Sequence, residues 1–209
     1  MIAEKPSVAQ SYAKNLSAYK REDGYLEGES CIVSWCLGHL AEYAQPEEYD
    51  PKYEKWQFDD LPILPEAWKL KVSKDKKKQF EVIKTLMNRS DVEYLVNGCD
   101  AGREGELIFQ RVYVLAGCRK PVKRLWISSM EDAAIQKGFR QMKVRKNIRI
   151  SVWLAVCRAQ ADWLIGMNRN QSIHQRLFKR LVVGRYRPQP LPCLQNGRRG
   201  SSIFKRSVL

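Results

Sequence analysis

The sequence is poor in the side chains that build many metal and hydrolytic sites. Its 209 residues include only two histidines, His39 and His174. The six cysteines form no Cys-x-x-Cys pair and have no histidine at zinc-like spacing. This pattern gives little support to a zinc site, a histidine metal site or a Ser-His-Asp triad. We interpret the cysteines as reduced thiols of a cytoplasmic protein, and His39, beside Gly38 in an apolar stretch, as a packed residue.

Long hydrophobic runs and, in the last third, acidic residues are also scarce. No apolar span or secretory signal is present, and the mean hydropathy is −0.48. Residues 1–136 carry 20 Lys and Arg against 22 Asp and Glu, whereas residues 137–209 carry 17 against one. So basic a segment is expected to face a polyanion. Nucleic acid is the natural partner because each neutralised phosphate releases counterions, and an anionic membrane surface is the weaker alternative.

The most informative stretch is residues 94–109, where an apolar run gives way to a helical pattern. Asp100 stands near the end of the apolar run, and a glycine turn leads to Glu104. Open α/β sheets build phosphate and metal sites at such strand ends. Mg²⁺ usually takes one or two protein carboxylates, with water and phosphate completing its shell, and Asp100 and Glu104 fit that need. The alternative is a surface turn with solvated charges that opens an amphipathic helix.

A second apolar segment, at the start of the chain, also ends in a carboxylate. Ile2 and Ala3 precede Glu4, and Pro6 follows in the first turn of an expected helix. Apolar residues recurring four apart predict that this helix has a buried face. Two strand ends therefore each present an acid.

Together, Glu4 and the 100–106 motif resemble the TOPRIM fold, the metal-binding module of topoisomerases, bacterial primases and some nucleases. Further motifs resemble the N-terminal domain of the bacterial topoisomerase III family of type IA enzymes. These motifs occupy residues 34–42, 46–49, 61–68, 124–130 and 158–168. The resemblance runs from residue 2 to about residue 185.

The resemblance and the hydrophobic pattern predict an α/β fold. We expect a TOPRIM-type open sheet, mostly parallel with flanking helices, followed by the start of a helical domain. The expected domains are a TOPRIM domain at 1–136, the start of a helical DNA-binding domain at 137–185, and a tail at 186–209. Predicted strands lie at 30–37, 92–99 and 122–127, and predicted helices at 7–16, 77–88, 104–116, 130–142 and 148–181. Residues 45–65, rich in proline and aromatics, are expected to form an ordered loop.

The family cleaves one DNA strand transiently and passes another through the gap without ATP. The resemblance implies that Glu4 donates or accepts a proton at the leaving 3′ oxygen, and that Lys5 stabilises the phosphate charge. It also implies that Asp100 and Glu104, together with Glu4, hold Mg²⁺. A tyrosine attacks the phosphate and holds the broken strand covalently.

The helical pattern after residue 148 resembles the family helix that lines a groove for single-stranded DNA. Arg158, Gln160 and Asn168 are therefore candidate DNA contacts. From the residues alone, Arg158 and Asp162 also suit a surface pair four residues apart. Trp153 and Trp163 suit base stacking, although an aromatic stripe at helical spacing is usually core.

The chain departs from the family pattern in two ways. Many type IA enzymes have Asp-x-Asp-x-Glu, but Gly102 stands at the middle acid, so a second metal ion is not expected. Glu106 is expected to point away from Glu104 along the helix. The nucleophilic tyrosine of the family lies beyond residue 209, so we expect a truncated fragment that is inactive alone.

The sequence after Arg185 leaves the family pattern. One permitted back-translation of residues 186–198, read one frame over after a G, encodes Val-Gln-Thr-Pro-Thr-Leu-Ala-Met-Leu-Ala-Glu-Arg-Glu, which resembles the family sequence. Our hypothesis is that residues 186–209 are translated out of frame. Tyr186 is then not a nucleophile.

Three functions remain open from the sequence. The first is the N-terminal part of a type IA topoisomerase, acting with Mg²⁺ on single-stranded DNA. The second is another TOPRIM enzyme, a nuclease or primase-like protein, in which metal-activated water attacks the phosphate. The third is a catalytically silent DNA-binding fragment.

Overall fold

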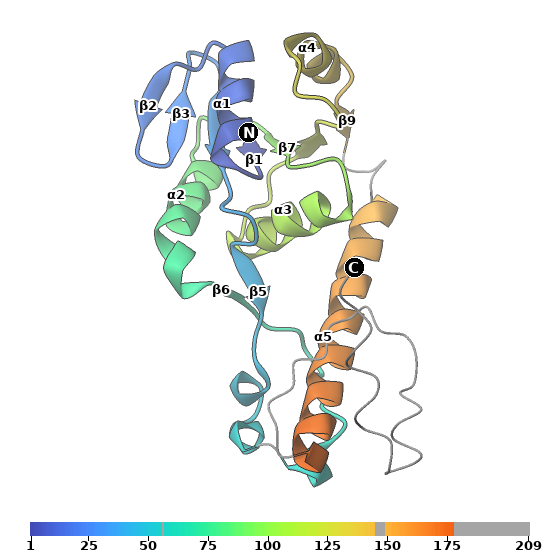
Figure 1. Cartoon of the computed structure of the whole chain (residues 1–209). Helices are drawn as coiled ribbons and strands as arrows, with labels where there is room; N and C mark the ends of the chain where they lie inside the picture. The colour runs from blue at the N-terminus through green and yellow to red at the C-terminus, as the bar shows by residue number, and fades with distance from the viewer. Residues whose placement is uncertain (56, 145–148, 178–209) are drawn as a thin grey trace, which may run out of the picture.

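A computed structural model describes residues 1–55, 57–144 and 149–177, and a seven-stranded sheet forms its centre (Figure 1). The strand order is β2-β3-β4-β1-β7-β8-β9. The strands are β1 (Ile2–Ala3), β2 (Lys20–Glu22), β3 (Tyr25–Glu27), β4 (Ile32–Trp35), β7 (Leu95–Gly98), β8 (Val122–Arg124) and β9 (Lys143–Val144). The central strands β4, β1, β7 and β8 are parallel, and β2, β3 and β9 are antiparallel to their neighbours. The predicted fold class, a mostly parallel open sheet, is confirmed.

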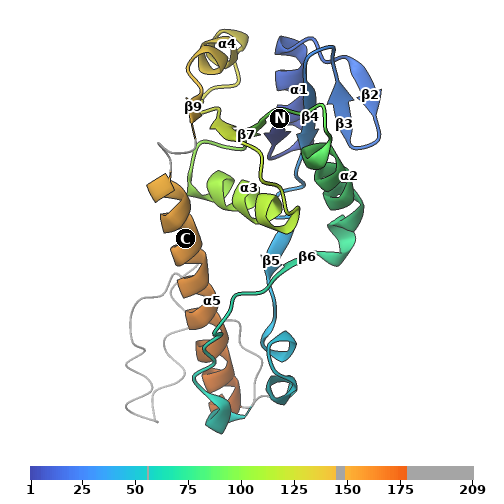
Figure 2. The ribbon, with the colours of Figure 1, turned by 180° about the vertical axis from the view of Figure 1, so that it is seen from behind.

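Helices cover both faces of this sheet, as the two opposite views show (Figures 1 and 2). One face is covered by α1 (Pro6–Asn15) and α4 (Asp132–Arg140), and the other by α2 (Lys77–Asn88) and α3 (Arg103–Leu115). The long helix α5 (Arg149–Leu177) packs against α3 and extends away from the sheet. The arrangement is a three-layer α/β domain with one helix projecting from it.

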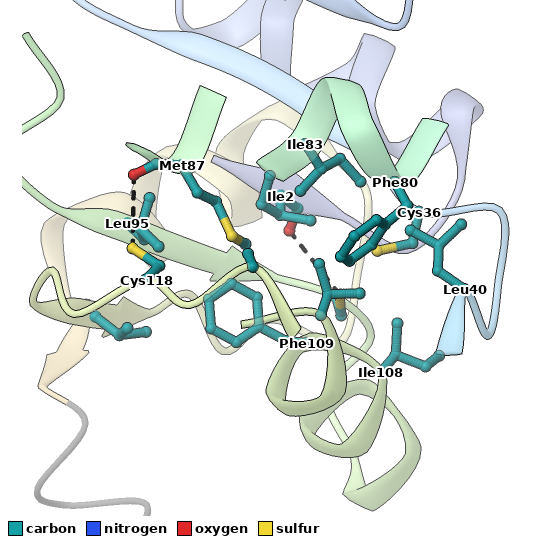
Figure 3. Packing of buried hydrophobic residues seen from close by; sticks show 14 residues of the cluster. Ile2, Cys36, Leu40, Phe80, Ile83, Met87, Leu95, Ile108, Phe109 and Cys118 are labelled. Carbon is teal, nitrogen blue, oxygen red and sulfur yellow. Dashed lines mark hydrogen bonds between the residues drawn. The ribbon is translucent and has the colours of Figure 1, made fainter. Parts of the chain in front are cut away.

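The side chains of the short central strands point alternately to the two faces of the sheet and so contribute to both hydrophobic layers of the core. Ile2 and Leu95 belong to the cluster beneath α2 and α3, which includes Phe109 (Figure 3). Ala3 and Val96, the next residues along, belong to the cluster beneath α1 and α4. Successive side chains of a strand point to opposite faces, so even a two-residue strand contributes to both layers.

A smaller core lies where α5 meets the segment between two further strands. β5 (Ala41–Tyr43) and β6 (Leu70–Val72) pair antiparallel. The segment between them carries the short 3-10 helices η1 (Pro46–Glu48), η2 (Pro51–Glu54) and η3 (Phe58–Asp60), and η4 (Lys74–Lys76) follows β6. Trp163 of α5 is only 8% exposed there, and its indole N–H donates to the Ala44 carbonyl at 3.0 Å. Trp163 is therefore a core residue, whereas Trp153 is 59% exposed.

The structure also bears on the expected domain limits. α4 crosses residue 136, and β9 adds to the main sheet, so the sheet layer extends to Val144. The proposed tail at 186–209, with Tyr186, and the last residues of the helix expected at 148–181 lie outside the described residues. No helix within the described part of the chain is both long and apolar enough to span a membrane.

Candidate functional site

The candidate site lies at the edge of the sheet where the parallel strands end. Glu4 directly follows β1, and Asp100 lies two residues after β7. The two strands are paired neighbours, with Ala3 opposite Gly98. His39 comes after β4, the neighbour of β1 on its other side. Because the carboxyl ends of parallel strands share one edge, the topology brings these residues to the same edge of the sheet.

Glu4 is the most enclosed of the predicted site residues. Its side chain is 13% exposed, and Oε1 lies 4.0 Å from the Lys5 Nζ. The other oxygen, Oε2, is buried and has no hydrogen-bond partner among the described residues. Lys5 is the residue before α1, so both side chains stand at the start of a helix, where the backbone dipole favours negative charge. A buried carboxylate oxygen without a donor suits a proton or a bound cation.

The turn that carries Asp100 and Glu104 depends on glycine. α3 begins directly after Gly102, and its first turn packs so closely on Asp100 that a Cβ at Gly105 would collide with the Asp100 carbonyl oxygen. Asp100 is exposed, and the Glu104 side chain is 65% exposed. Glu106, in contrast, is buried and paired with Arg124, so it points away from Glu104 as expected.

Carboxylates are suitable ligands for a divalent cation, but these side chains do not form a complete coordination site by themselves. The described residues contain no group of three His, Cys, Asp or Glu side chains placed to hold a metal ion. The structure therefore does not bring Glu4, Asp100 and Glu104 together as a three-ligand site. The unpartnered oxygen of Glu4 and the exposed carboxylates of Asp100 and Glu104 are hard donors. They suit an ion that takes water and phosphate oxygens as its remaining ligands.

His39 occupies a position that the sequence interpretation missed. Its Nε2 lies 3.6 Å from the Glu104 Oε2, and its side chain is 47% exposed, so it borders the site rather than lying packed in the core. Burial lowers the pKa of His39, the charge of Arg111 lowers it further, and Glu104 and Glu4 oppose this shift. The net shift below 6.5 makes His39 mainly neutral at pH 7.

A cavity of about 210 Å³ lies beside Glu104, between α3 and α5. Its charged and polar lining consists of His39, Arg103, Glu104, Arg111, Arg158 and Asp162. Glu104 and Arg111 are seven residues apart on α3, which places them on one helix face. That spacing is the sequence signal that places Arg111 on the helix face of Glu104.

The three predicted DNA contacts on α5 have different surroundings. Arg158 lines the cavity. Gln160 hydrogen-bonds with Tyr43; burial raises the pKa of Tyr43, and Arg111 and this hydrogen bond oppose the rise. The Asn168 amide binds the backbone of Ile63, accepting from its N–H at 2.5 Å and donating to its carbonyl at 3.1 Å. As DNA contacts, all three stay predictions.

Comparison with known proteins gives the family. The model of the Toprim domain, a metal-binding domain, matches residues 1–130. The chain belongs to the Toprim domain family. The resemblance inferred from its motifs is confirmed.

Curated relatives narrow this assignment. The Bacillus subtilis (strain 168) protein named DNA topoisomerase 3 is 44% identical over 185 residues, which are 88% of this chain and 25% of that protein. The Bacillus licheniformis protein of the same name is 42% identical over 205 residues, or 98% of this chain and 28% of that protein. The chain thus spans about a quarter of the length of these relatives.

A solved structure supports the fold independently. The full-length topoisomerase I from Thermotoga maritima superimposes with a TM-score of 0.57 at 18% identity, covering 88% of this chain and 27% of that chain. At this identity the likeness concerns the fold alone.

Proposed function

We propose that this chain forms the metal-binding part of a type IA DNA topoisomerase of the topoisomerase III kind, acting on single-stranded DNA in the cytoplasm. The observation that carries the proposal is the carboxyl edge of the sheet, where the mostly enclosed Glu4, with its buried and unpartnered Oε2, stands beside the strand end and helix start that present Asp100 and Glu104. The names of the relatives favour this function over a nuclease or primase.

Each residue has a separate task in this proposal. Asp100 and Glu104, together with Glu4, would hold Mg²⁺, which would supply positive charge to the scissile phosphate when bound. Glu4 gives a proton to the leaving 3′ oxygen and takes it back on religation, and its enclosure keeps the proton from bulk water. Lys5, 59% exposed beside Glu4, stabilises negative charge on the phosphate.

In this proposal the DNA strand is held by the basic segment that begins at residue 137. We propose that Arg158 contacts the DNA backbone from α5, with Gln160 and Asn168 as further contacts. The attacking tyrosine is proposed to come from polypeptide outside these 209 residues. The expected division, with residues 1–136 for metal chemistry and 137–185 for DNA, remains part of the proposal.

A chimera tests the function directly. The 185 matched residues would replace the corresponding quarter of the Bacillus subtilis relative. We expect Mg²⁺-dependent, ATP-independent relaxation of negatively supercoiled plasmid. Glu4→Gln and Asp100→Asn should each slow relaxation by roughly 100-fold or more, the contribution typical of a positioned acid or charge-stabilising group.

The matched control is Asp59→Asn, which removes an exposed carboxylate from η3. It should relax plasmid like the unsubstituted chimera. A chimera that binds DNA but leaves it supercoiled would contradict the proposal. Accumulation of nicked or linear plasmid without religation would point to a nuclease instead.

A further inference from the structure

Helix α5, which projects from the sheet domain, is apolar on two sides (Figures 1 and 2). Ala155 and Trp163, 4% and 8% exposed, belong to the side that packs against α3 and the segment between β5 and β6. The other side carries an apolar stripe of exposed residues at helical spacing, namely Ile150, Trp153, Leu154, Cys157, Ala161 and Ile165. A helix that is apolar on two sides is normally covered on both, so the stripe marks an interaction surface.

The composition of the apolar stripe indicates what kind of partner it suits. None of its six residues is charged. Arg158 and Asp162 lie beside the stripe, on the part of α5 that lines the cavity next to α3. A nucleic-acid backbone is bound mainly through lysine and arginine, so the stripe does not have the composition of a DNA-binding face. It suits the apolar surface of a protein.

The spacing of the apolar stripe is self-complementary. In two identical antiparallel helices related by a two-fold axis, each residue faces the one that lies equally far on the other side of a shared midpoint. With the midpoint between residues 157 and 158, Ile150 faces Ile165, and Leu154 faces Ala161. Trp153, next to Leu154, reaches the same alanine. Large side chains therefore meet a small one, as close packing of two helices requires.

We propose that the apolar stripe of α5 is a two-fold, antiparallel dimer interface between two copies of this chain. The inference does not depend on the proposed function. Residues 150–165 span about 22 Å of helix. A pair of helices of that length forms an interface at the small end of the specific range, below about 1,200 Å² in total. The dimer is therefore reversible, with a dissociation constant on the order of 10 μM.

The test is sedimentation equilibrium of the 209-residue chain at concentrations from about 1 to 200 μM, since association follows mass action. The average mass should rise from the 24.3 kDa of one chain toward twice that value. Ile165→Gln should weaken dimerisation at least about tenfold, because the apolar side chain is lost from both copies. Monomers at every concentration would overturn the proposal.

Val114→Gln is the matched control, since Val114 is also β-branched, lies on a helix and is 53% exposed, but on α3. It should dimerise like the unsubstituted chain. Thermal-unfolding midpoints within a few degrees of the unsubstituted value show that both variants fold. Equal dissociation constants for Ile165→Gln and Val114→Gln would place any dimer interface elsewhere and overturn the proposal.

A charge pair across the two copies tests the antiparallel register. Trp153→Lys and Ala161→Glu should each weaken dimerisation, because each puts a charge into the apolar interface. The two positions lie about two turns apart in one helix, so their side chains meet only between copies. The double variant should dimerise more tightly than either single variant. Weakening in the double variant equal to the product of the two single effects would contradict the register and overturn the proposal.

The alternative occupant is the polypeptide that follows this region in the relatives, of which the chain spans about a quarter. In that case Ile165→Gln would lower the thermal-unfolding midpoint of the Bacillus subtilis chimera more than Val114→Gln does. That result, with a 209-residue chain that stays monomeric, would assign the stripe to the rest of the enzyme and overturn the proposal. Plasmid relaxation by the chimera tests the proposed function separately, so each can fail without the other.

Discussion

The guanidinium of Arg124 is buried against the carboxylate of Glu106, and the two side chains are 0% and 2% exposed. Arg124 also donates to the carbonyl oxygens of Cys99 at 2.6 Å and Asp100 at 2.7 Å. The pair thus ties β8 and α3 to the backbone that carries Asp100. Glu106 therefore supports this loop, although it lies only two residues from the exposed Glu104.

Arg124→Met should destabilise the fold strongly. The substitution leaves the Glu106 carboxylate buried without its partner and removes the donors to four backbone carbonyls. The expected loss is about 3–5 kcal/mol in the free energy of unfolding, measured by urea denaturation. Arg119→Met, at an exposed position, should change stability by less than about 0.5 kcal/mol. Equal stability of the two variants would show that the pair does not hold the loop.

The sequence predicted the layers of the fold because its helices and buried strands have strong periodicity. α2 occupies the residues expected, and α1, α3 and α4 differ by a few residues at their ends. The β2–β3 hairpin at 20–27 was missed because its short strands are half-exposed and have no apolar run. β5 and β6 were missed because they pair across a long segment with no repeating pattern.

The sequence predicted the part of the candidate site that has local signals and missed the part that depends on tertiary packing. Glu4, Asp100 and Glu104 follow apolar runs and glycines, which are local signals. The roles of His39 and Arg111 arise from packing between β4, α3 and α5, which lie far apart in the chain. Helical spacing identifies the face that Arg111 shares with Glu104, but only the tertiary structure shows that α5 closes it into a cavity.

Asn168→Ala tests whether this residue anchors α5. The variant leaves the N–H and carbonyl of Ile63 without their partner, and Ile63 is 1% exposed. We expect a loss of about 1–3 kcal/mol in unfolding free energy, measured by denaturant titration. Asn168→Asp keeps the acceptor for the Ile63 N–H but loses the donor, so it should also destabilise. Stability equal to that of the unsubstituted chain would remove Asn168 from the anchor.

Arg111→Gln should raise the pKa of His39. Burial and the Arg111 charge both lower this pKa, and removing the positive charge makes protonation easier. NMR titration of the imidazole resonances measures the shift directly, since His174 is the only other histidine. Arg21→Gln should leave the value unchanged. A lower or unchanged pKa in Arg111→Gln would contradict the geometry of the cavity.

The lowered pKa of His39 also makes its contribution to the free energy of unfolding depend on pH. Its folded pKa lies below the unfolded value of about 6.5, so near and below that pH the folded state binds fewer protons than the unfolded state. The contribution of His39 is complete above pH 6.5 and is lost as pH falls below it. In Arg111→Gln this loss should be smaller, because the two pKa values lie closer together.

The central claim is a metal site at the carboxyl edge of the sheet, and Mg²⁺ titration of the 209-residue chain by calorimetry tests it most directly. We expect weak binding by the unsubstituted chain and by the exposed control Asp59→Asn, because few carboxylates are available. Asp100→Asn should lose this binding while keeping the thermal-unfolding midpoint of the folded chain. The same Mg²⁺ affinity in Asp100→Asn as in Asp59→Asn would contradict the account.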